Sequence, residues 1–136
     1  MYKFILFAIA GITMLSCSKS NNNKPAEYSL NGSYTGSFKR FNITEDKTAN
    51  VTIQFKDGQW TGNSDMQYYP AISNGAVSII DNEVIRFENK TPWTANFDWS
   101  YILDGSYLLH QNSDSLIFTR SYGNGGVDVY RLVKMH

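Results

Sequence analysis

Side chains that commonly carry out chemistry are scarce in this sequence. It holds one cysteine, Cys17, and two histidines, His110 and His136. A hydrolase triad can be drawn from Ser106, His110 and Asp104, but no Gly-x-Ser-x-Gly motif positions the serine. No paired spacing of His, Asp or Glu would bring several ligands around one metal ion. We therefore expect neither an enzyme nor a bound metal or cofactor.

Aromatic residues are the one enrichment that points to a site, at 15% of the chain. On one interpretation these rings fill and cap a small core. On the other, some of them line a concave apolar pocket or form a stacking platform for a sugar or lipid, with Gln67, Asn96 and Asp98 fixing its orientation. The candidate ligand-binding residues lie in or beside the middle connections of the chain: Trp60, Tyr69, Trp93, Phe97 and Trp99.

The elements that must position these rings are strands. Val51, Ile53 and Phe55 alternate with polar residues, which is the pattern of a strand with one buried face. Asp57-Gly58 follows them and predicts a tight hairpin. No apolar pattern with a 3.6-residue period lasts through a helix length.

The whole chain is therefore predicted to be all-β. Eight or nine short strands joined by tight turns are typical of an up-and-down antiparallel barrel or a sandwich, and sequential hairpins without a long crossover favour the barrel. At about eight strands, a barrel is filled by side chains or holds one small ligand. The expected strands cover residues 31–41, 51–56, 59–62, 75–80, 84–88, 98–103, 106–111, 115–120 and 127–134.

The N-terminus has the features of an export signal. Lys3 precedes an apolar run over residues 4–15 that is shorter than the roughly 20 residues needed to span a bilayer. The run closes on Met14-Leu15-Ser16-Cys17, which resembles the lipobox of bacterial lipoproteins. The resemblance implies a signal peptide over 1–16 and a lipid on Cys17, followed by a polar linker to residue 29. It also implies an outer-membrane anchor, and we expect the periplasmic face, with the cell surface and inner membrane as alternatives.

Size and charge limit the remaining possibilities. Residues 30–136 have the length of one domain, and in the whole chain 12 basic residues balance 12 acidic ones. The lysines and arginines are scattered, so nucleic acid is not expected as a partner. We expect a monomer.

A second resemblance concerns the ends of the domain. Gly32-Ser33-Tyr34 resembles the Gly-x-Trp opening of lipocalins and other calycins, with tyrosine in place of tryptophan. Residues 130–134 resemble the last strand of small bacterial lipocalin-like lipoproteins, and residues 103–107 fit the same pattern. The family resemblance implies that Arg131 lies across Tyr34 and closes the barrel through cation–π attraction.

Two functions follow from these expectations. The first is a lipid-anchored barrel that binds a small, partly apolar ligand among the five candidate aromatic residues. The alternative is a filled barrel that recognises a protein or glycan partner through its loops. A continuous apolar cavity would favour the first function, and a packed interior with tryptophans exposed on the loops would favour the second.

Overall fold

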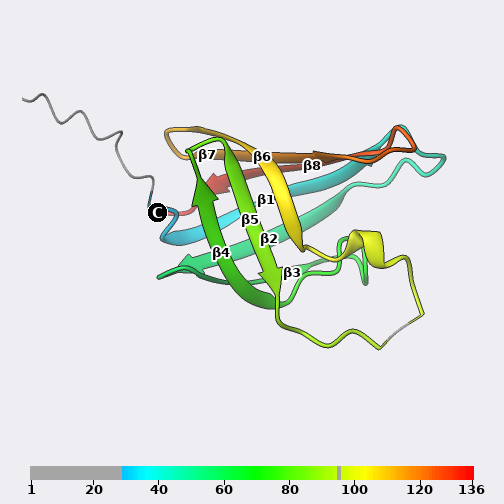
Figure 1. Ribbon diagram of the computed structural model, residues 1–136, viewed down its shortest axis with the longest axis horizontal. Coiled ribbons are helices and arrows are strands. Elements are labelled where there is room, and N and C mark those ends of the chain that lie inside the picture. The colour runs from blue at the N-terminus through cyan, green and yellow to red at the C-terminus, as the bar shows by residue number, and fades with distance from the viewer. Residues whose placement is uncertain (1–28, 95) are drawn as a thin grey trace, which may run out of the picture.

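The computed structural model describes residues 29–94 and 96–136 as an all-β closed barrel (Figure 1). The predicted signal peptide, Cys17 and the linker up to residue 28 lie outside the described residues. The eight strands are β1 (Gly32–Phe41), β2 (Ala49–Lys56), β3 (Gln59–Ser64), β4 (Asn74–Ile80), β5 (Val84–Asn89), β6 (Gly105–Asn112), β7 (Ser115–Ser121) and β8 (Val127–Lys134).

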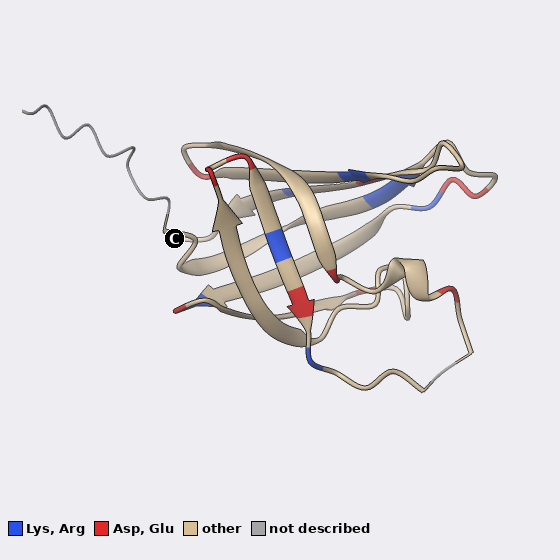
Figure 2. Ribbon diagram, in the orientation of Figure 1, with Lys and Arg blue, Asp and Glu red and all other residues tan. Residues whose placement is uncertain are grey.

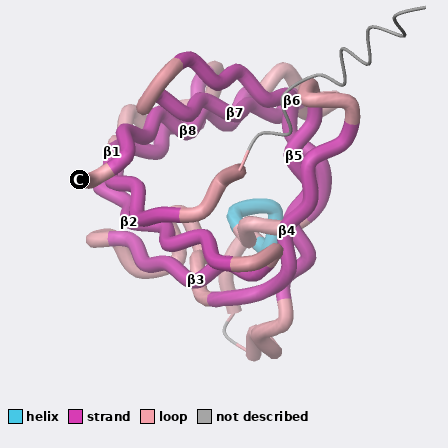
Figure 3. The backbone as a smooth tube through the Cα atoms, turned by 90° about the vertical axis from the view of Figure 1, so that its left-hand side faces the viewer, coloured by secondary structure: helices cyan, strands magenta, loops and turns pink. Residues whose placement is uncertain are grey.

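The strands follow one another around the barrel in chain order. Each pairs antiparallel with its neighbours in the sequence, and β1 closes the ring by pairing with β8 (Figure 3). This confirms the predicted up-and-down barrel. Closure leaves no free sheet edge, which is how a small meander avoids pairing with other chains.

The tight hairpin predicted at Asp57-Gly58 is confirmed, and a second short turn joins β4 to β5. Asp57 and Gly58 have φ of 50° and 75°, and Asp81 and Asn82 have φ of 51° and 59°. Positive φ at both central residues is the turn geometry that matches strand twist, and Gly and Asn adopt it readily. Two residues connect Lys56 to its partner Gln59, whereas three residues, 81–83, lie between Ile80 and its partner Val84. The Asp57-Gly58 turn therefore sets the register of β2 with β3.

The two ends of the barrel differ. The turns β2–β3, β4–β5 and β6–β7 are short and lie at the end where the chain enters β1, which we call the tether end. The connections over 42–48, 65–73, 90–104 and 122–126 are longer and lie at the opposite end, which we call the loop end (Figure 1). Acidic residues mark the short turns at the tether end, and lysines and arginines are scattered over strands and loops (Figure 2).

Aromatic rings fill the barrel. Phe118 and Tyr130 stack with centroids 4.5 Å apart, and Phe38 lies 4.7 Å from Tyr130. Leu30 joins this core at the tether end with 8% of its surface exposed. The interior is therefore a packed core. Its largest fully buried side chains are Trp60, Tyr34, Tyr107, Tyr130, Phe38, Phe55, Phe87, Phe118, Ile53, Ile85, Leu103 and Leu116.

The strand predicted over 98–103 is wrong. This segment forms a short 3-10 helix, η1 (Trp99–Tyr101), which is capped by Asp98. One carboxylate oxygen of Asp98 accepts a hydrogen bond from the backbone N–H of Ser100 at 2.9 Å. This local bond offers the backbone an alternative to a strand ladder, and the alternating aromatic residues gave no sign of it.

The predicted contact between Arg131 and Tyr34 is also wrong. Tyr34 is opposite Lys134 in the β1–β8 register, and the ammonium of Lys134 lies 5.9 Å from the centre of its ring. Arg131 is opposite Ser37, is exposed, and lies 6.0 Å from the ring of Phe41. Side chains alternate between faces along a strand, and Arg131 is three residues before Lys134, which shares the face of Tyr34. Arg131 is therefore on the outer face.

Candidate functional site

The five predicted ligand-binding residues divide into two groups. Trp60 and Tyr69 are 1% and 6% exposed and belong to the core, where Trp60 packs edge-on against Phe87 at 5.6 Å. The other three, Trp93, Phe97 and Trp99, lie in or beside the connection between β5 and β6 at the loop end. The structure therefore does not place all five around one cavity.

A cluster of four rings forms at the loop end. Tyr68, from the β3–β4 connection, stacks on Phe97 with centroids 4.4 Å apart and an interplanar angle of 8°. Trp93 meets Phe97 edge-on at 5.8 Å, and Trp99 lies 6.5 Å from Phe97. We call Tyr68, Trp93, Phe97 and Trp99 the loop-end aromatic cluster. Trp99 is 58% exposed, so the cluster presents a large aromatic surface to solvent.

Backbone contacts hold the two connections together. The N–H of Ala71 donates to the carbonyl of Tyr101 at 3.0 Å, and the N–H of Leu103 donates to the carbonyl of Ala71 at 3.0 Å. Leu103 is fully buried in the core. The indole N–H of Trp93 donates to the side-chain oxygen of Asn89 at the end of β5, at 3.2 Å. The cluster is therefore attached to the barrel on both sides of η1.

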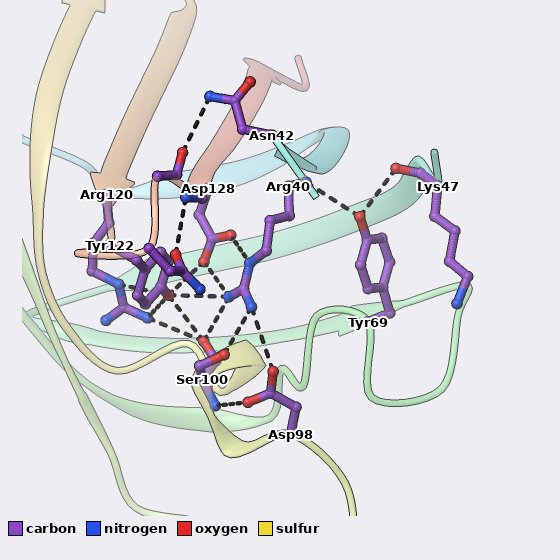
Figure 4. Close-up of polar contacts among 12 residues, drawn as sticks. Arg40, Asn42, Lys47, Tyr69, Asp98, Ser100, Arg120, Tyr122 and Asp128 are labelled. Atoms are coloured by element: carbon purple, nitrogen blue, oxygen red, sulfur yellow. Dashed lines mark hydrogen bonds and ion pairs between the residues drawn. The ribbon is translucent and has the colours of Figure 1, made fainter. Parts of the chain in front are cut away.

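A row of charged side chains crosses the barrel beneath η1. Asp128 in β8 is opposite both Arg40 in β1 and Arg120 in β7. Each charged residue lies two positions from a buried aromatic residue of its own strand, on the same inward face and nearer the loop end. The pairs are Arg40 with Phe38, Arg120 with Phe118, and Asp128 with Tyr130. The loop end of an otherwise apolar interior is therefore closed by ionic groups (Figure 4).

Arg40 and Asp128 form a buried ion pair. Nε and Nη2 of Arg40 donate to the two carboxylate oxygens of Asp128 at 2.6 and 2.9 Å, and the residues are 6% and 1% exposed. Burial by itself lowers the pKa of Arg40, but the hydrogen bond and charge of Asp128 outweigh it and raise the pKa above its ordinary value. Two parallel bonds of this kind are geometrically specific as well as strong.

Arg40 of this ion pair also binds η1, through hydrogen bonds to Ser100. Nη1 of Arg40 donates to the Ser100 hydroxyl at 2.7 Å, and Nη2 donates to the Ser100 carbonyl at 3.0 Å. Arg120 Nη2 donates to the same carbonyl at 3.2 Å. Tyr122 Oη lies 3.0 Å from that carbonyl and 2.7 Å from Asp128 Oδ2, and gives its single hydrogen to one of them.

Tyrosine rings cover both arginines. The guanidinium of Arg40 lies 3.8 Å from the ring centre of Tyr101, and that of Arg120 lies 4.5 Å from the ring of Tyr107. Burial, followed by the hydrogen bond to Asp128, raises the pKa of Tyr122. All three nitrogens of the Arg40 guanidinium have acceptors within the chain. The network is thus suited to holding a loop in place and leaves Arg40 few donors for a ligand.

A groove of about 470 Å³ lies over this network. The exposed Asp98 forms part of it, and hydrogen bonds from Ser100 hold the pKa of Asp98 below its usual range, so its carboxylate is charged near neutral pH. The groove is lined mostly by hydroxyl, amide and charged side chains: Arg40, Ile43, Thr44, Glu45, Asp98, Ser100, Tyr101, Tyr122 and Asn124.

A second groove, of about 510 Å³, lies at the tether end beside Leu30 and Phe55. It is bounded by the β2–β3 turn and by β4, and Asn31 and Asp57 bond to each other across its rim. Among its lining residues, Asp57 is the only charged side chain and Phe55, which belongs to the core, is the only aromatic one.

The sequence could have indicated the charged row. Arg40, Arg120 and Asp128 each continue an inward-facing apolar alternation, and a charge at such a position needs a partner. The predicted polar residue Asp98 lines the groove, Gln67 lines a small hollow of about 210 Å³ beside Trp93, and Asn96 is exposed.

Among residues 29–94 and 96–136, no group of three or more His, Cys, Asp or Glu side chains gathers into a metal site. Within the same residues, no helix has the length and apolar character to cross a membrane. No family model matches this chain, and comparisons with curated proteins and with solved structures find no match.

Proposed function

We propose that this protein is a lipid-anchored interaction module, a filled barrel that recognises a protein or glycan partner through its loop end. The observation that carries the proposal is the distribution of the aromatic residues. Trp60 and the rings around it pack the interior, whereas Trp99 is 58% exposed on a loop. Large exposed aromatic side chains with polar neighbours are typical of binding surfaces.

The end of the barrel at which the chain enters β1 supports this proposal. Leu30 lies at the tether end, and the loop-end aromatic cluster lies at the opposite end of the barrel (Figure 1). A chain held at a membrane through Cys17 would then carry its loop end away from the lipid. The polar run over residues 18–24 gives such a domain a short spacer.

The charged row supports it further because it fixes the surface in advance. Ser100 receives hydrogen bonds from Arg40 and Arg120, and it directly follows Trp99. A loop held in its bound conformation loses less conformational entropy when a partner binds. The buried ions are therefore best explained as positioning groups for η1.

Carriage of a small apolar ligand has less support. The predicted cavity residues Trp60 and Tyr69 are themselves part of the packed core. A ligand inside the barrel would have to displace several buried rings, each contributing about 1.5–3 kcal/mol through its burial.

The test is photo-crosslinking in living cells that produce the protein. Benzoylphenylalanine is incorporated at Asn96, which is exposed beside the cluster, or at Leu108, which is 68% exposed on the barrel wall. We expect a covalent adduct from position 96 that disappears when Trp99→Ala is added, and none from position 108. Adducts from position 108 alone, no adduct from either position in a chain that also binds no glycan, or an adduct from 96 that is insensitive to Trp99→Ala would contradict the proposal.

A further inference from the structure

We infer that the loop end binds a neutral carbohydrate, with a sugar ring stacked on Trp99 and neighbouring hydroxyls in the polar groove beside it. This inference rests on the proposed function and names the chemistry of the partner. The first observation behind it is that the stacking surface and the groove share one element. Asp98 and Ser100, which flank Trp99 in η1, both line the groove.

The exposed tryptophan and the polar groove match the face and the edges of a sugar ring, respectively. A pyranose presents a face of C–H groups, which an aromatic face with its negative quadrupole attracts. The edges of the same ring carry hydroxyls that both donate and accept hydrogen bonds. The groove supplies partners of both kinds, including the Thr44 hydroxyl, the Asn124 amide and the Asp98 carboxylate.

The charges around the groove favour a neutral ligand. The positive groups Arg40, Arg120 and Lys47 are matched in number by the negative groups Asp98, Asp128 and Glu45. Lys47 pairs with Glu45 at 2.5 Å, and Arg40 pairs with Asp128 at 2.6 Å. A phosphate or a polyanion would find no cation without a partner among these six, and would lie near two exposed carboxylates.

The cluster geometry also argues against a cage for a cationic ligand. Tyr68 and Phe97 are stacked on each other at 4.4 Å, so their facing surfaces are occupied. A cation bound by aromatic residues is surrounded by several ring faces. The face of Trp99 that remains exposed beside the polar groove fits a flat, polyhydroxylated ring better.

The experiment is isothermal titration calorimetry with the full-length chain in a detergent that has no sugar headgroup. The probes are cellohexaose, maltohexaose, mannohexaose and chitohexaose, with hexagalacturonate as an anionic comparison. We expect at least one neutral hexasaccharide to bind, and hexagalacturonate to bind more weakly. No heat from any neutral probe at up to about 10 mM, where even weak binding is measurable, would overturn the inference, as would a preference for the anion.

Variants identify the site. Trp99→Ala should weaken binding at least about tenfold, whereas Trp99→Phe, which keeps an aromatic face, should stay within about threefold of the unmodified chain. Thr44→Trp narrows the groove and should also weaken binding. Leu108→Ala on the barrel wall is the matched control and should bind normally. Equal binding by Trp99→Ala and the unmodified chain would overturn the inference.

The two proposals can fail separately. A protein adduct at position 96, together with no saccharide binding, would overturn the carbohydrate and leave the interaction module. The absence of both would remove the interaction module as well.

Discussion

Replacing Asp128 by alanine should remove much of the stability of this domain. Asp128 is 1% exposed and accepts two hydrogen bonds from Arg40, at 2.6 and 2.9 Å. Its Oδ2 also lies 2.7 Å from Tyr122 Oη. Asp128→Ala removes the buried counter-ion of Arg40 and leaves only Asp98, whose exposed carboxylate lies 3.7 Å from Nη1, so the buried guanidinium is largely uncompensated.

The magnitude follows from that uncompensated charge. Breaking a buried ion pair by removing one partner typically costs about 3–5 kcal/mol. A domain of this size is stable by about 5–15 kcal/mol, so the variant should lose about a fifth or more of its free energy of unfolding. Replacing both partners, as Arg40→Met with Asp128→Leu, removes the buried guanidinium together with its buried counter-ion and should cost less than Asp128→Ala alone.

Urea unfolding followed by circular dichroism measures these losses. Asp46→Ala is the control, because Asp46 pairs with Lys39 on the surface and its side chain is 87% exposed. That variant should unfold like the unmodified protein. In Asp128→Ala, amide exchange of Ser100 should also accelerate, since η1 loses part of its anchor. A loss below about 1 kcal/mol, the value of an ordinary surface pair, would refute the positioning role of the charged row.

Four further predictions concern two tyrosines, the pairing of β1 with β8 and the lipid anchor on Cys17. Tyr107 Oη is buried with no hydrogen-bond partner among the described residues, so Tyr107→Phe should leave stability equal or higher, while Tyr122→Phe should lose about 1.5–3 kcal/mol in the same urea titration. Burial raises the pKa of Tyr107 and Tyr122, so these phenols lose their protons at a lower pH in the unfolded chain than in the folded one. The free energy of unfolding should therefore fall as pH rises above about 10, and phenolate absorbance at 295 nm should appear as the protein unfolds. A Cβ at Gly36 would lie 1.9 Å from the Arg131 carbonyl oxygen, so Gly36→Ala should destabilise the β1–β8 seam by about 3 kcal/mol or more, whereas Gly123→Ala, with no neighbour within 4 Å, should change thermal unfolding little. Cys17→Ser should move the protein from the membrane fraction to the soluble fraction, and unchanged membrane attachment would contradict lipid anchoring.

Most of the fold could be predicted because its signals are local. The alternation of Val51, Ile53 and Phe55 and the Asp57-Gly58 turn specify β2 and its hairpin, and the structure places all three apolar side chains inside. Strand β8 matches its predicted range, 127–134. These features depend only on residues that are close together in the sequence, so a single sequence is enough to predict them.

The errors come from interactions between distant segments. The segment over 98–103 has strand-like composition, but Ser100 is held by Arg40 from β1 and by Arg120 from β7. The interpretation of Arg131 failed because the β1–β8 register places Lys134 opposite Tyr34. Neither pairing is visible without knowing which strands close the barrel.

The candidate site was predicted in part. Trp93 and Trp99 both contact Phe97, because the three residues share one connection, and their role in binding a ligand stays a prediction. Trp60 and Tyr69 were grouped with them, because the sequence alone does not tell an aromatic side chain that packs inside the barrel from one that is exposed on a loop. The register that carries Trp60 and the packing around Tyr69 put both inside the barrel.

The claim that the barrel is filled can be tested with Trp60 alone. The chain has three tryptophans, so Trp93→Phe with Trp99→Phe leaves Trp60, which is 1% exposed, as the only one. We predict blue-shifted emission that palmitate titration leaves unchanged, in protein that native mass spectrometry shows to be free of small molecules. A saturable shift of Trp60 emission at one palmitate per chain, with a co-purifying lipid, would show that the barrel is a carrier instead.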